Sequence, residues 1–459
     1  MDCLRLMKQQ PFKTAAVAIL SALLIALSAC TRKPTSPQAP PASNRAEASP
    51  SSPLAQGSES SMAAVRFLEE RVKYDADDIV ALNKLSAYYL QLHRETDDVN
   101  YLERALHAAE ASLRVLPADQ NLGGLRALAH AEYETHNFVS ARDHAKELTE
   151  YEPRSSFGFQ LLGDALVELG DYDGATTAYA SMEKLDRGSV ATEARLAHLA
   201  FLRGETGTAR KRYEVALHQA RAASLPSAET IAWCHWQIGE LEAATGRYDQ
   251  AEQAYRKALD TYTDYPHALA SLALVRAGRG DVPAAIETLE KVVRKHSDPV
   301  DAVALGDLFK ISAREDEAER QYDAAERWSQ QTKLHAALYN RHLVMFWVNH
   351  DRNLDKAYEL ASKEYETRRD VYGADALAWA ALKAGKIDKA QSAMKEALRL
   401  KTQDARLFYH AGMIARAAGD RVAAADFLQR AVKLNPHFDP WQSKIAANAL
   451  KETALFAAR

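Results

Sequence analysis

From residue 63 onward, the chain shows apolar positions three and four residues apart, separated by charged and polar positions. This spacing is typical of amphipathic helices with one buried face. Long stretches of strict alternation, which would predict half-buried strands, are missing from the same region. Ala, Leu, Glu, Lys and Arg dominate it, and these residues favour helices. The pattern therefore predicts an all-α protein.

The helical pattern repeats along the chain. A small residue recurs at intervals of 33 to 42 residues, most of them 33 or 34, at Ala105, Ala141, Ala175, Ala209, Ala251, Ala285, Ala318, Ala357, Ala390 and Ala424. In six copies a glycine lies five positions earlier, where a left-handed residue ends a helix at low cost. We expect two antiparallel helices per repeat, with the small residues at the helix crossing.

The period and the small residues resemble those of the tetratricopeptide repeat. The resemblance implies a right-handed superhelix of about ten helix-turn-helix repeats over residues 63–436, followed by a capping helix in 437–459. Two copies depart from the pattern. The first carries extra residues near 94–99, and in another Met345 and Glu364 stand where small residues are usual. We expect a distorted helix pair in the copy that contains Met345 and Glu364.

The first thirty residues are typical of an export signal. Arg5, Lys8 and Lys13 precede an apolar run from Thr14 to Leu27. Fourteen helical residues cover about 21 Å, short of the roughly 30 Å of a bilayer core. The run ends in Leu-Ser-Ala-Cys, which resembles the lipobox of bacterial lipoproteins. The resemblance implies that residues 1–29 are a signal peptide and that Cys30 is lipidated.

Residues 30–62 contain many Pro, Ser and Ala and lack Ile, Val, Phe, Tyr and Trp. Such a segment buries too little apolar surface to fold, so we expect a disordered tether.

Thr31 follows the cysteine, whereas an Asp at that position commonly retains lipoproteins in the inner membrane. The expected location is therefore the bacterial cell envelope, at the outer membrane if the source is Gram-negative.

Composition and the lack of known motifs argue against several classes of function. The chain has 58 basic and 62 acidic residues, a net charge of −4, which does not favour nucleic acid. Its three cysteines cannot build a disulfide framework or a zinc site. Phosphate-binding, metalloprotease and esterase signatures are missing. We expect no enzymatic activity, no metal and no cofactor beyond the lipid on Cys30.

The resemblance also implies a binding surface, because the first helix of each pair lines the concave groove in this family. The groove candidates are Arg126, Tyr133, Phe157, Trp233, Trp236, Tyr339, His342, Phe346, Tyr372, Trp379 and Tyr409. Large aromatic side chains bury much area with few rotatable bonds, so they suit a partner-binding surface. The alternative is that some of these aromatic residues close the joints between repeats.

These observations predict a membrane-anchored scaffold or adaptor that binds a protein or peptide segment of an envelope complex. One alternative is a module that binds glycans or assists envelope-polysaccharide assembly, because Trp and Tyr also stack on sugars. A less favoured alternative is a hydrolase with a site in residues 330–370. His342, His350, Asp351 and Glu364 would be its acid–base groups.

Overall fold

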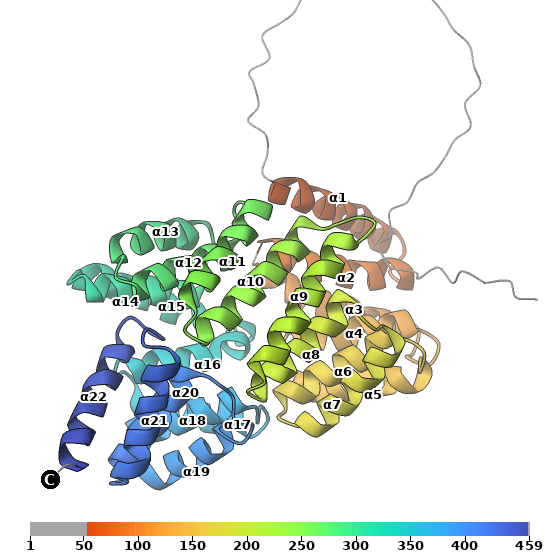
Figure 1. The fold of residues 1–459 in the computed structure, drawn as a ribbon. Coiled ribbons are helices and arrows are strands. Elements are labelled where there is room, and N and C mark those ends of the chain that lie inside the picture. Colours follow the sequence, from red (N-terminus) through yellow and green to blue (C-terminus); the bar gives the residue numbers. More distant parts are fainter. Residues whose placement is uncertain (1–52, 97, 297, 458–459) are drawn as a thin grey trace, which may run out of the picture. The chain divides into compact units, whose positions relative to one another are not determined.

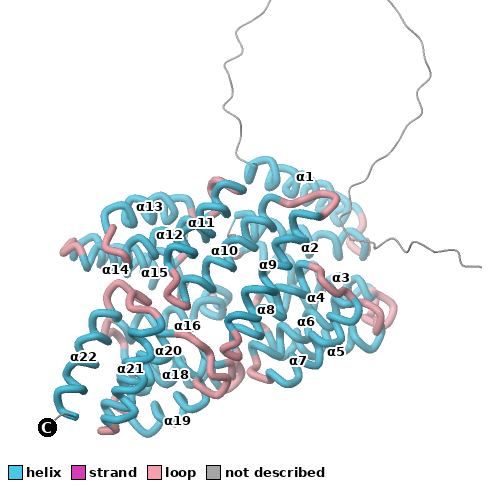
Figure 2. The backbone as a smooth tube through the Cα atoms, in the orientation of Figure 1, coloured by secondary structure: helices cyan, strands magenta, loops and turns pink. Residues whose placement is uncertain are grey.

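The computed structural model describes residues 53–96, 98–296 and 298–457, and these residues form 22 helices and no strand (Figures 1 and 2). The helices are α1 Pro53–Tyr74, α2 Ile79–Thr96, α3 Asn100–Val115, α4 Leu122–Glu134, α5 Phe138–Tyr151, α6 Ser156–Glu168, α7 Tyr172–Leu185, α8 Val190–Leu202, α9 Thr206–Ala222, α10 Ala228–Ala244, α11 Tyr248–Thr261, α12 Pro266–Gly278, α13 Val282–Lys295, α14 Pro299–Ile311, α15 Glu315–Ser329, α16 Lys333–Asn349, α17 Leu354–Tyr365, α18 Val371–Lys383, α19 Ile387–Ala397, α20 Ala405–Ala417, α21 Arg421–Leu434 and α22 Gln442–Ala457.

The helices from α2 to α21 form ten consecutive pairs, and α22 packs on α21. The predicted repeat array and its C-terminal capping helix are therefore confirmed. The ten recurring alanines lie on the second helix of each pair, and every one of them is 0% exposed. Six turn glycines, one in each of six pairs, have positive φ angles, as their position predicts. The repeat pattern thus reflects close helix crossings and tight turns.

The structure corrects the predicted end of the tether. Helix α1 begins at Pro53, so residues 53–62 are helical and are not part of a disordered segment. The Ser61 hydroxyl donates to Glu95 on α2 (3.2 Å), and Val65 and Leu68 of the same helix are buried. Packing on α2 therefore stabilises a stretch whose composition alone favours disorder. Residues 1–52, including Cys30 and the predicted signal peptide, lie outside the described residues.

In three repeats a glycine on the first helix accommodates a tyrosine ring from the second. A Cβ atom on Gly163, Gly239 or Gly306 would lie 2.3–2.4 Å from the ring of the tyrosine sixteen residues later. Each tyrosine hydroxyl donates, over 2.7 Å, to the carboxylate that follows the glycine. The pairs are Tyr179 with Asp164, Tyr255 with Glu240, and Tyr322 with Asp307. These contacts fix the two helices of one repeat against each other.

The irregular repeat is formed by α16 and α17. Helix α16 has 17 residues, and Asp351 and Asn353 adopt positive φ in the turn that follows it. Glu364 accepts a hydrogen bond from Arg341 (3.1 Å), so a carboxylate stands where the other copies have Ala, Ser, Val, Leu or Met. The expected departure from the regular pattern is therefore present.

Segments far apart in the sequence also meet. The Val371 amide donates to the Tyr172 hydroxyl (2.9 Å), and the Tyr248 hydroxyl donates to Asn435 Oδ1 (2.7 Å). These partners are 199 and 187 residues apart. Repeats that are not neighbours in the sequence therefore contact each other.

Candidate functional site

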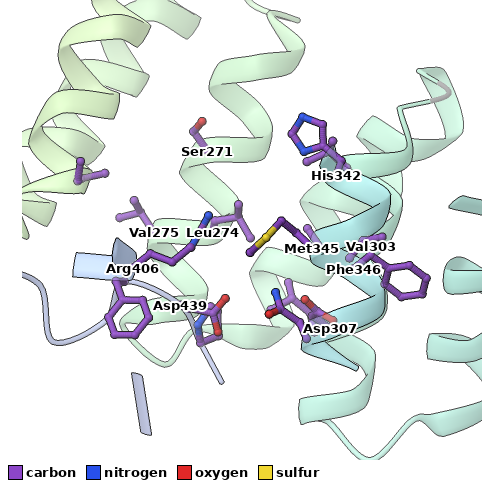
Figure 3. A pocket seen from close by; sticks show the side chains of 18 of the residues that line it. Ser271, Leu274, Val275, Val303, Asp307, His342, Met345, Phe346, Arg406 and Asp439 are labelled. Carbon is purple, nitrogen blue, oxygen red and sulfur yellow. The ribbon is translucent and has the colours of Figure 1, made fainter. Parts of the chain in front are cut away.

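A cavity of about 430 Å³ lies between repeats (Figure 3). Its walls come from α10, α12, α14 and α16, which are the first helices of four successive pairs. The wall is completed by Tyr248 and Tyr255 on α11, by Ala325 and Ser329 on α15, by the beginning of α20 and by the segment 435–440. This volume falls in the range of pockets that hold small ligands or several peptide side chains. The cavity is therefore the candidate site.

One part of the cavity wall is apolar. Leu274 and Val275 on α12, Val303 on α14 and Met345 on α16 point toward the open space. Leu274 and Val300 are each 38% exposed, although both are large aliphatic residues. Apolar surface that remains open to solvent in a concave site indicates a place where a partner's apolar side chain gains burial.

The polar part of the wall contains carboxylates that are already hydrogen-bonded. Glu240 accepts from Ser271 (2.6 Å) as well as from its tyrosine, and Asp307 lies 3.0 Å from His350 Nε2. Asp439 accepts from the backbone amides that begin α22. The exposed Arg406 side chain at the start of α20 adds a positive charge to this lining. The site therefore combines apolar surface with charged groups of both signs.

His342 faces the cavity from α16 (Figure 3). Although His342 is exposed to solvent, the protein atoms packed around its imidazole and the charge of Arg341 together lower its pKa to about 4. His342 is therefore neutral near pH 7, and it offers one hydrogen-bond donor and one acceptor.

Among the eleven predicted groove residues, only His342 and Phe346 line this cavity, and Phe346 is 4% exposed. The prediction of groove exposure is wrong for Trp379 and Tyr409, which are 3% and 2% exposed. Trp379 stacks on His410 (4.3 Å between ring centroids), and Tyr409 packs against Phe438 (5.5 Å). Both residues close joints between repeats, as the alternative interpretation held.

The other predicted groove residues are half-buried and contact residues of their own repeat or of a neighbouring one. Arg126 donates to Glu152 (2.7 Å) and lies over the Phe157 ring, and Trp236 donates to Ser271 (3.0 Å). The remaining contacts are Tyr133 against Phe138, Tyr339 against Trp328, Tyr372 with Asp404, and Trp233 against three core clusters. Partner binding by these residues stays a prediction.

The residues of the hydrolase alternative do not form one site. His350 contacts Asp307, Asp351 pairs with Lys383 (2.7 Å), and Glu364 pairs with Arg341. Only His342 and His350 share the cavity. Within the described part of the chain, no group of three His, Cys, Asp or Glu side chains could hold a metal ion. The geometry therefore offers no acid–base pair for hydrolysis among these four residues.

Sequence reasoning missed several residues of the cavity wall, among them Leu274, Val303 and Asp439. One signal was present: Met345 is a large residue at a position that is small in other repeats, and it points into the cavity. Asp439 could not be found in this way, because it lies beyond the last repeat.

Cys234 and His235 lie next to each other on α10, and both are buried. Burial raises the pKa of the Cys234 thiol to about 12, so this thiol is not an activated nucleophile. His235 Nε2 lies 2.8 Å from Arg221 Nη2. Arginine can only donate, so this contact requires a neutral imidazole.

The His235 contact predicts a loss of stability in acid. Burial lowers the pKa of His235 to about 4 in the folded state, below the roughly 6.5 expected after unfolding. Above pH 6.5, neutral His235 makes its full contribution to the free energy of unfolding. This contribution is lost as the pH falls through 4, and the loss between pH 7 and 4.5 is about 2 kcal/mol. Urea unfolding at these two pH values should show a smaller loss in His235→Gln, whose amide oxygen can still accept from Arg221. An equal loss in both proteins would contradict the assignment.

None of the described helices is long and apolar enough to cross a bilayer.

Three stretches of the chain match a known family of repeats. Residues 189–264, 231–302 and 376–437 match the tetratricopeptide repeat. No curated protein matches the chain.

Several solved structures are similar to the chain. A tetratricopeptide repeat protein from Parabacteroides merdae is 16% identical, with a TM-score of 0.32, over 58% of this chain and 98% of that one. The human IFIT1 dimer with PPP-AAAA is 14% identical, with a TM-score of 0.44, over 83% of this chain and 87% of that one. A MamA protein is 22% identical, with a TM-score of 0.30, over 37% and 95% of the two chains.

The repeats named by these matches generally bind protein or peptide partners. The matched residues include α10, α12 and the beginning of α20, which form part of the cavity wall. Residues 189–302 and 376–437 are thus similar to tetratricopeptide repeats, which generally serve as a non-catalytic interaction scaffold.

Proposed function

We propose that this protein is a non-enzymatic scaffold that binds a segment of a partner protein in the cavity between α10, α12, α14, α16 and α20. The observation that supports the proposal is the cavity itself. First helices of four successive repeats line it, and aliphatic side chains on them remain exposed. A partner side chain entering this space would bury apolar surface on both molecules.

The role of the cavity in partner binding is tested by a charged substitution on its apolar wall. Leu274→Glu places a carboxylate among apolar neighbours without replacing a buried core residue, since Leu274 is 38% exposed. Partner recovery in a pull-down from the native cells should fall at least tenfold, because the carboxylate would lose its hydration when a partner binds. The matched control is Val422→Glu on α21, which is 83% exposed and does not line the cavity. Equal partner sets for Leu274→Glu and the unchanged protein would contradict the proposal.

We also propose that lipidated Cys30 anchors the scaffold to a bacterial envelope membrane, at the outer membrane if the source is Gram-negative. The support is the basic, apolar and lipobox-like order of the first thirty residues. Several acyl chains hold a protein stably where a single chain binds only marginally. Cys30→Ala should therefore move the protein from the membrane fraction to the supernatant. A protein that stays in the membrane fraction after this change would refute the lipid anchor.

A further inference from the structure

Turns in the first half of the array contact loops in the second half. We call these contacts the seam. It joins the turns 168–172, 202–204 and 243–248, each between the two helices of a repeat, to the loops 368–371, 399–402 and 434–437. The first two loops connect successive repeats, and the third leads from the last repeat to α22. The three sets of contacts follow one another in the same order along both halves.

The polar contacts of the seam are specific. In the first set, the Val371 amide donates to the Tyr172 hydroxyl (2.9 Å) and Arg399 donates to the Gly170 carbonyl (3.0 Å). In the second set, the Thr402 hydroxyl donates to the Leu202 carbonyl. Thr402 and Val371 are both 0% exposed, so these polar contacts lie away from water.

The third set contains a reciprocal pair of bonds. The Tyr248 hydroxyl donates to Asn435 Oδ1 (2.7 Å), and Asn435 Nδ2 donates to the Ala243 carbonyl (2.8 Å). Asn435 is 3% exposed. A buried amide with both its oxygen and its nitrogen in use indicates a built interface, since leaving either group without a partner would be costly.

Three glycines allow the backbones to approach at the seam. A Cβ atom on Gly170, Gly204 or Gly246 would lie 2.3–2.4 Å from the carbonyl oxygen of Arg369, Lys401 or Leu434, respectively. Gly385 and Gly419 occupy the same turn position in later repeats, with similar positive φ, and nothing lies within 4 Å of their Cβ sites. The three seam glycines are therefore needed for the contact as well as for the turn.

The seam and the cavity share residues. Tyr248 and Asn435 belong to the third set of contacts and also line the cavity, as does His437 in the adjoining loop. Separation of the third set would therefore remove part of the cavity wall. In a repeat array each unit is stabilised by its sequence neighbours, so non-neighbouring repeats can separate without unfolding any of them.

We propose that the seam is a latch that opens and closes as a unit. Leu274 and Val300 are already exposed in the closed state, and opening would give access to more of the cavity, including the half-buried Met345. The inference deepens the proposed function, because it assigns a gate to the site where the partner would bind. A two-state contact between preformed arms is a recognised way to couple closure to binding. A partner segment held in the cavity would favour the closed seam, and a closed seam would slow the release of that segment.

The experiment compares two glycine substitutions in a reporter background. Met345→Cys places a thiol in the cavity, and its reaction with N-ethylmaleimide is read at residue 345 by peptide mass spectrometry. Gly246→Ala and Gly385→Ala place alanine at closely similar φ angles (74° and 72°), but only the first alanine meets a carbonyl across the seam. We expect residue 345 to be labelled at least tenfold faster in Gly246→Ala than in Gly385→Ala.

Two further variants separate the latch from a local effect of the turn. Asn435→Ala deletes the third set of contacts without changing the backbone of the turn, and it should also accelerate labelling. Tyr172→Phe removes a hydrogen bond at the first set, which is outside the cavity wall, and should act in the same direction if the seam opens as a unit.

Equal rates of labelling at residue 345 in Gly246→Ala and Gly385→Ala would overturn the proposal of a latch. Acceleration in Asn435→Ala but not in Tyr172→Phe would overturn opening as a unit. Labelling is measured without a partner, so the latch can be confirmed even if Leu274→Glu leaves the partner set unchanged, and the two proposals can fail separately.

Discussion

Gly239→Ala is expected to lower the free energy of unfolding by about 3 kcal/mol, at the upper end for overpacking in a tight core. The new Cβ would lie 2.3 Å from the ring of Tyr255, which is 1% exposed. The ring cannot turn aside easily, because its hydroxyl is hydrogen-bonded to Glu240 (2.7 Å). Urea unfolding followed by circular dichroism measures the loss.

A double-mutant cycle tests whether the ring is the cause. Tyr255→Leu in the Gly239→Ala background reproduces the combination that the next repeat uses at Ala273 and Leu289, both buried. The two substitutions should cost about 1–2 kcal/mol less together than the sum of their separate effects. Gly207→Ala on α9 is the matched control, since nothing lies within 4 Å of its Cβ site. This control should be neutral or slightly stabilising, whereas additive effects in the cycle would contradict the explanation.

The sequence was sufficient to predict the repeats because a helix crossing constrains residues within one period. An alanine that must be fully buried at every crossing leaves a signal at intervals of 33 to 42 residues, most of them 33 or 34, and ten such signals define ten pairs. A repeat that has the tyrosine but lacks the glycine also differs at the neighbouring residue. Tyr213 lies sixteen residues after Ala197, and the next residue is His198, so no carboxylate follows the small residue there as it does in the three glycine-containing repeats.

The candidate site was less predictable because it depends on contacts outside the period. Asn435 and Tyr248 are 187 residues apart, and no spacing rule relates them. The rule that first-helix positions face a groove failed for Tyr409, because Phe438 in the loop before α22 covers its ring. Composition also placed residues 53–62 in the tether, whereas packing of α1 on α2 makes them helical.

Asp370→Ala is expected to lower the free energy of unfolding by about 3–5 kcal/mol, because it leaves a buried charge without its main partner. Arg341 makes two bonds to this carboxylate (3.1 and 2.7 Å), and both side chains are largely buried. The same carboxylate accepts from the amides of Tyr372 and Gly373 at the start of α18. One substitution therefore removes an ion pair and a helix cap together.

The contributions of the ion pair and of the helix cap can be separated by comparison with an aspartate that caps a helix but forms no ion pair. Asp420 accepts from the Ala423 amide (2.9 Å) at the start of α21 and is exposed, so Asp420→Ala should cost only about 1 kcal/mol. Asp370→Asn, which keeps an oxygen for the amides but removes the charge, should fall between these two variants in the same urea titration. If Asp370→Ala costs no more than Asp420→Ala, the Arg341 pair contributes nothing to stability. A larger cost would mean that the Asp370–Arg341 pair, whose guanidinium also reaches Glu364, contributes to the stability of the irregular repeat.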